Sequence, residues 1–131
     1  MRIAIPVCDN QVATVMDFAG RLLLIDCEAG QETEREMVDF SEQLVPAKVT
    51  RLDDLGVNLL ICGAISRPFS AMVLHSGIEI IPFISGTVDD VLSAYFRGYL
   101  VDPRFLMPGC RVGQHWGRRG RRRGHGGFSW E

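Results

Sequence analysis

Four cysteines are the residues of this 131-residue chain best suited to metal chemistry. They are Cys8, Cys27, Cys62 and Cys110, and no two of them form a C-x-x-C pair. Their local spacing therefore excludes a zinc ribbon and a ferredoxin-type cluster motif. In a reducing compartment a disulfide framework is not expected either. Thiols that act together in this chain must be brought together by the fold.

Two of these cysteines stand where a strand is expected to end. Cys8 follows an alternating apolar stretch, and Cys62 ends an apolar run directly before Gly63. In an open α/β sheet, ligands bind beyond the carboxyl ends of the strands. Cys8 and Cys62 are therefore candidate soft metal ligands, with Cys110 as a third. A free cysteine is also among the most buried residue types, so an inert core position for Cys62 stays open, and Cys27 is interpreted as structural.

Several residues near these thiols are suited to an anionic ligand. Ser66 and Thr87 each stand at the expected start of a helix, where backbone N–H groups attract anions. Both are first of all helix caps, so an anion role would be additional. The candidate cofactor-binding residues are Gly63, Ser66, Arg67, Gly86 and Thr87, together with Asp17 and Arg21. For the charged members the alternatives are a solvated surface charge at Arg67 and a simple Asp17–Arg21 pair.

Hydrophobic periodicity predicts the elements that must position these residues. The expected strands cover residues 3–7, 21–27, 32–40, 57–62 and 78–84, and the expected helices cover about 46–55, 66–77 and 87–98. Three strands with short connections followed by alternating helix and strand predict an α/β fold with a mixed five-stranded sheet. Its element order is strand, strand, strand, helix, strand, helix, strand, helix. Pro6 favours an edge position or an irregular exit for the first strand.

The charge of the chain is divided between two segments. Residues 1–107 carry eight basic and fifteen acidic residues, and residues 108–131 carry six arginines and one glutamate. The first segment, with a net charge of −7, is the predicted domain, and the second, with +5, is a predicted flexible Gly/Arg-rich tail. No apolar run approaches the roughly 18 residues needed to span a bilayer. The N-terminus has the character of a first strand rather than a signal peptide, so we expect a cytoplasmic protein without membrane contact.

The order and spacing of several short motifs in the chain resemble those of the dinitrogenase iron–molybdenum cofactor biosynthesis family. The matching stretches are Ile3-Ala4-Ile5, Asp17-Phe18-Ala19-Gly20-Arg21 to Asp26, Gly56-Val57, Leu60-Ile61-Cys62-Gly63-Ala64-Ile65, Gly77-Ile78, Gly86-Thr87-Val88 and Gly98-Tyr99-Leu100. They span roughly residues 1–101. The family often has a histidine before the Phe-Gly of its second block, where this chain has Asp17, so an anion replaces a possible cluster ligand.

The resemblance implies a ribonuclease-H-like fold and a non-catalytic role. The implied cargo is the iron–molybdenum cofactor, its precursor or a related molybdenum- or iron–sulfur cluster. The implied partners are the proteins that donate and accept that cluster.

Other functions are weighed against this one. A nuclease of the ribonuclease H kind needs converging carboxylates, and the first strand, "RIAIPV", carries none. No Walker-type loop, GxGxxG or HExxH is present. The main alternative is a nucleic-acid-binding module, in which the arginines and aromatics of residues 108–131 contact phosphates and bases. Two other roles stay open for that segment. It could close over a bound cluster through Cys110, His115 and His125, or it could dock loosely on the acidic domain.

Overall fold

The computed structural model describes residues 1–41 and 44–98. The predicted domain boundary at 107/108, the candidate ligand Cys110 and the whole basic segment 108–131 lie outside the described residues. All other candidate site residues lie within the two described ranges.

A mixed sheet forms the centre of the molecule, as predicted. Its strands are β1 (Arg2–Cys8), β2 (Gln11–Val12), β3 (Arg21–Glu28), β4 (Gln31–Asp39), β5 (Leu59–Ile61) and β6 (Glu79–Ile81). The spatial order is β4-β3-β1-β5-β6. The pairs β4–β3 and β3–β1 are antiparallel, whereas β1–β5 and β5–β6 are parallel. One half of the sheet is thus antiparallel, and no α-helix lies between its strands in the sequence. The other half is parallel, and α-helices connect its strands.

The predicted number of strands is one too low. The missed strand, β2, has two residues and pairs antiparallel with the end of β1 through Val7 and Val12. A one-turn 3₁₀ helix, η1 (Met16–Phe18), comes after it. Segments of two or three residues carry no periodicity, so their form is decided by the partner strand rather than by their own sequence.

The first strand is central, not at the edge that Pro6 favoured. Its pairing with β5 ends at Ala4 and Leu60, so Pro6 lies beyond the last residue that β5 contacts in the ladder. The carbonyl oxygen of Pro6 instead accepts a hydrogen bond from the backbone N–H of Ala13 at 2.8 Å. A missing N–H is tolerated there, which agrees with the irregular exit.

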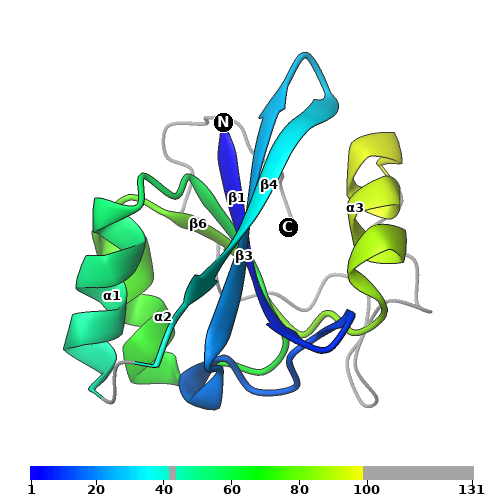
Figure 1. Ribbon diagram of the computed structural model, residues 1–131. Coiled ribbons are helices and arrows are strands. Elements are labelled where there is room, and N and C mark those ends of the chain that lie inside the picture. Colours follow the sequence, from blue (N-terminus) through cyan, green and yellow to red (C-terminus); the bar gives the residue numbers. More distant parts are fainter. Residues whose placement is uncertain (42–43, 99–131) are drawn as a thin grey trace.

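Three helices cover the two faces of the sheet (Figure 1). Helices α1 (Val45–Asp54) and α2 (Arg67–His75) pack on one face, and α3 (Val88–Arg97) packs on the other. One core cluster lies under α1 and α2 and includes Leu24 and Phe69, and a second lies under α3 and includes Ile5 and Val91. None of the helices in the described part of the chain is long and apolar enough to cross a membrane.

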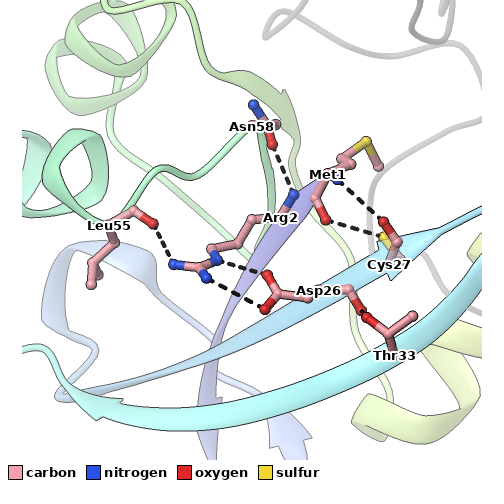
Figure 2. A network of polar contacts seen from close by, with 7 residues as sticks. All are labelled: Met1, Arg2, Asp26, Cys27, Thr33, Leu55 and Asn58. Atoms are coloured by element: carbon pink, nitrogen blue, oxygen red, sulfur yellow. Dashed lines mark hydrogen bonds and ion pairs between the residues drawn. The ribbon is translucent and has the colours of Figure 1, made fainter.

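The amino edge of the sheet is tied together by Arg2 (Figure 2). The Arg2 guanidinium donates from Nε to Asp26 Oδ1 at 2.8 Å and from Nη1 to the carbonyl oxygen of Leu55 at 2.7 Å. The backbone N–H of Arg2 donates to Asn58 Oδ1 at 2.8 Å. One side chain thereby joins β1, β3 and the end of α1.

Candidate functional site

The predicted site residues come from segments that converge at the carboxyl edge of the parallel strands. Cys8 ends β1, residues 62–66 come after β5, and residues 82–87 come after β6. Because β3 runs antiparallel to β1, its first residue, Arg21, lies at the same edge. The fold therefore gathers the predicted residues along one side of the sheet, although their surroundings differ strongly.

Gly63 is required by the chain's own backbone. A Cβ atom at this position would lie 2.5 Å from the carbonyl oxygen of Thr14 and 2.6 Å from that of Ala13. Ala64 donates its N–H to Thr14 O at 2.8 Å, and its carbonyl oxygen accepts from Met16 N–H at 2.7 Å. Residues 13–16 therefore make a close backbone approach to Gly63, and its candidate role in cofactor binding stays a prediction.

Asp17 accepts two hydrogen bonds from Ser66 at the start of helix α2. Its Oδ1 accepts a hydrogen bond from the Ser66 backbone N–H at 2.9 Å, and its Oδ2 accepts from Ser66 Oγ at 2.6 Å. Ser66 Oγ in turn accepts from the Phe69 N–H at 3.4 Å, which confirms Ser66 as the N-cap. A carboxylate of the chain thus occupies the positive end of α2. No ion pair joins Asp17 to Arg21, although both lie in the described part of the chain.

Lys48 completes this arrangement, and sequence reasoning missed it. Its side chain is only 3 % exposed, and Nζ donates to the carbonyl oxygens of Asp17 at 2.8 Å and Ala19 at 3.2 Å. Nζ also lies 5.2 Å from the centre of the Phe40 ring. Lysine is rarely buried unless its ammonium is satisfied, and here carbonyl oxygens at the η1 turn satisfy it. No local signal around Lys48 distinguishes it from a surface lysine.

The two candidate thiols of the described part differ in accessibility. Cys62 is fully buried in the cluster under α1 and α2, and burial, with a smaller contribution from the Asp17 charge, raises the pKa of its thiol. Cys8 is exposed. A buried protonated thiol is a poor metal ligand, whereas an exposed one at the sheet edge is accessible to a soft metal. Cys27 is buried, and its Sγ donates to the Met1 carbonyl oxygen at 3.5 Å.

The second helix start, at α3, is more open. Thr87 caps the helix by accepting from the Asp90 N–H at 3.3 Å, as predicted. Gly86, with a φ of 132°, receives the Val12 N–H at 3.0 Å on its carbonyl oxygen. Beside this turn lies a cavity of about 380 Å³ between the start of α3 and the sheet. Its lining is Val7, Asp9, Asn10, Leu23, Arg35, Met37, Thr87, Val88 and Asp89.

The basic candidates are available on the surface. Arg21 and Arg67 are both exposed, and Phe18, three residues before Arg21, is 85 % exposed. Within residues 1–41 and 44–98, no three histidine, cysteine, aspartate or glutamate side chains gather as a metal site. Any soft-metal binding by this part of the chain would thus depend on few protein ligands plus charge and backbone donors.

Known proteins resemble this chain in sequence and in fold. The family model described as dinitrogenase iron-molybdenum cofactor matches residues 1–98. The crystal structure of PH0822 is similar, with a TM-score of 0.73 and 22 % identity over 76 % of this chain and 92 % of that one. The apo form of the orange protein from Desulfovibrio gigas has a TM-score of 0.64 and 18 % identity over 76 % and 89 %.

These structures support the fold, and no curated protein matches the chain. The family model, however, covers the whole described part, including both turns of the carboxyl edge. The chain therefore belongs to the dinitrogenase iron-molybdenum cofactor family.

Proposed function

We propose that this protein is a non-catalytic, cytoplasmic carrier of an anionic metal–sulfur cluster, which it receives from and passes to proteins of cofactor assembly. The cargo would be the iron–molybdenum cofactor, its precursor or a related molybdenum- or iron–sulfur species. The observation that carries the proposal is the family match over residues 1–98. It spans the fold and the carboxyl edge rather than a single short motif.

The chemistry of the carboxyl edge fits such a cargo at one thiol. Cys8 is exposed at the end of β1, and thiolate is a preferred ligand of soft metals. Val7, its neighbour, lines the cavity beside Thr87, and the exposed Arg21 begins the adjacent strand β3. A cluster bound by Cys8 would combine one metal–sulfur bond with the charge of the arginines at this edge; Cys8 itself is not part of the cavity lining beside Thr87, which includes the carboxylates Asp9 and Asp89.

The same chemistry disfavours the other half of the predicted set. Cys62 is buried with a raised pKa, and Asp17 already holds the donors of Ser66. An anion brought to the start of α2 would have to displace that carboxylate. Within the proposal, Gly63, Ser66 and Cys62 shape the edge, while Cys8, Arg21, Arg67, Gly86 and Thr87 receive the cargo.

Loading with tetrathiomolybdate tests the proposal directly. The full chain is mixed anaerobically with this soft molybdenum–sulfur anion and desalted, and retained molybdenum and visible absorption are measured. Wild type should keep molybdenum with charge-transfer bands, and Cys8→Ala should lose most of both. Cys27→Ala, which removes a buried thiol at the other end of the sheet, is the matched control and should load like wild type.

Further variants test the other residues that the proposal assigns to the site. Cys110→Ala examines the third predicted ligand, and the pair Arg21→Gln and Arg67→Gln should weaken retention most at low salt. A wild-type protein that stays colourless and molybdenum-free would contradict carriage. Loading that is unchanged in Cys8→Ala would remove that thiol from the proposed site.

The alternative of nucleic-acid binding rests on residues 108–131. Nothing in residues 1–41 and 44–98 specifically favours a nucleic-acid partner, so cluster carriage is the function that we propose.

A further inference from the structure

The amino edge of the sheet carries a concentrated negative charge. Between residues 26 and 36 the chain has five carboxylates and one arginine. These residues form the end of the β3–β4 hairpin, whose turn at Ala29 and Gly30 has positive φ at both positions. Residues 28–37 are exposed. We call the exposed carboxylates Glu28, Glu32, Glu34 and Glu36 the acidic hairpin surface.

The basic residues nearby already have partners. Arg35 is bound to Glu32 and lies 3.2 Å from Asp89, and Arg2 is bound to Asp26. The hydrogen bond to Asp26 is the main cause that raises the pKa of Arg2, and the charges of Glu34 and Glu36 make smaller contributions in the same direction. The register places Glu34 opposite Asp26, so like charges face each other across β3 and β4. An added cation would relieve this repulsion.

Strand β4 is also an open edge. It is the last strand of the sheet order, so the backbone on its outer side has no partner strand among the described residues. Two copies of this edge would bring glutamates against glutamates, which disfavours pairing with a second copy. The surface is suited to a cationic segment instead.

The chain itself contains such a segment within reach. Tyr95, in the last turns of α3, packs against the cluster that contains Cys27, and Figure 1 shows the end of α3 and the hairpin turn at the same end of the molecule. Arg118 stands twenty residues beyond Gly98, a stretch that reaches up to roughly 65 Å when extended. Arg119, Arg121 and Arg123 have the two-residue spacing of Glu34 and Glu36.

We propose that the basic segment 108–131 docks on the acidic hairpin surface of its own chain, along the outer side of β4. The arginines pair with Glu28, Glu34 and Glu36, because Glu32 is already bound to Arg35. The segment with a net charge of +5 meets a surface whose net charge, with Arg35 included, is −3. The interaction is electrostatic and is weakened by salt.

The test uses ¹⁵N NMR of the full chain to observe the backbone amide resonances of residues 31–37. In wild type these resonances should shift between low salt and about 0.5 M NaCl, where charges are screened within a few ångströms. The triple variant Arg119→Gln, Arg121→Gln, Arg123→Gln should already show the high-salt positions at low salt. Core resonances that stay unchanged establish that each variant folds.

Two charge variants of the domain locate the contact. Glu34→Gln with Glu36→Gln should lose most of the salt response. The matched control Asp9→Asn with Asp90→Asn removes two exposed carboxylates at the opposite edge and should keep it. Tenfold dilution should change nothing if the segment docks on its own chain.

Three results would overturn the inference. One is low-salt resonances of 31–37 that are the same in wild type and in the arginine variant. Another is an equal loss of the salt response in the control pair. The third is a response that fades on dilution, because it would mean docking between copies.

Discussion

The carboxyl edge and the amino edge of the sheet both bind polar side chains within the chain, but they differ in how these side chains are bound and how far they are buried. At the carboxyl edge, the buried Lys48 ammonium is bound to two carbonyl oxygens, and the partly buried Asp17 accepts from the backbone N–H and the hydroxyl of Ser66. At the amino edge, Arg2 and Asp26 form an ion pair whose side chains are 35 % and 37 % exposed. Water can replace a lost partner of the Arg2–Asp26 pair but not of the buried Lys48 ammonium, so the hydrogen bonds of Lys48 contribute more to stability.

Gly63→Ala should have the largest effect, because it breaks the carboxyl edge at its tightest point. The added methyl group meets two backbone oxygens within 2.6 Å, and neither can move without displacing residues 13–16. We expect the free energy of unfolding, measured in urea, to fall by about 3 kcal/mol or more.

Gly20→Ala is its control, since nothing lies within 4 Å of a Cβ there. That variant should stay close to wild type. Equal stability of the two variants would mean that the 13–16 segment yields easily.

Asp17→Ala should come next, with a loss of about 1–3 kcal/mol. It leaves the Ser66 N–H and hydroxyl without their acceptor at the start of α2. Urea unfolding of Asp17→Ala, Ser66→Ala and the double variant measures the coupling, which should be clearly non-additive. Asp54→Ala, an exposed carboxylate at the end of α1, should cost nothing.

Thr87→Ala sharpens the comparison within the carboxyl edge. Among the residues that the structure describes, no second acceptor like Asp17 supports this cap, so the expected loss is about 1 kcal/mol in thermal or urea unfolding. Thr87→Ser keeps the hydroxyl and should restore most of it. A loss as large as that of Asp17→Ala would show that the two helix starts are equally dependent on their caps.

Asp26→Asn should have the smallest effect and reveal itself in the pH dependence. The hydrogen bond from Arg2 lowers the pKa of the Asp26 carboxyl below its ordinary value of 3.8. A lowered pKa in the folded state means that its contribution is present above about pH 4 and is lost as the pH falls further.

Thermal midpoints of wild type and Asp26→Asn should therefore differ near neutral pH and converge in acid. Glu28→Gln makes the same charge change on the hairpin and serves as the reference. A gap that widens toward low pH would contradict the assignment.

Local sequence signals were sufficient for much of the fold. Alternation and apolar runs located four strands, and the turn at residues 28–31 indicated the fifth, which is polar. Ser66, Thr87 and Gly98 correctly marked helix ends because caps and positive-φ glycines act within a few residues. The order of connections also predicted which half of the sheet is parallel.

What the sequence could not reveal depends on distant segments meeting. The role of Gly63 is set by Thr14, and the burial of Lys48 by the η1 turn. Whether Cys62 faces the core or the edge depends on how α1 and α2 cover β5, which no pattern around Cys62 records. The site prediction therefore placed its residues along one edge of the sheet but could not distinguish the buried part of that edge from its exposed part.

The placement of β1 also has a consequence for the order of folding during synthesis. The strand made first becomes the centre of the sheet, pairing with β3 on one side and β5 on the other. The meander of β1, β3 and β4 can form once residues 1–39 have left the ribosome, whereas β5 must wait for α1. We expect this antiparallel half to serve as the template on which β5 and β6 are added in turn, since the more distant pairing is the slower one.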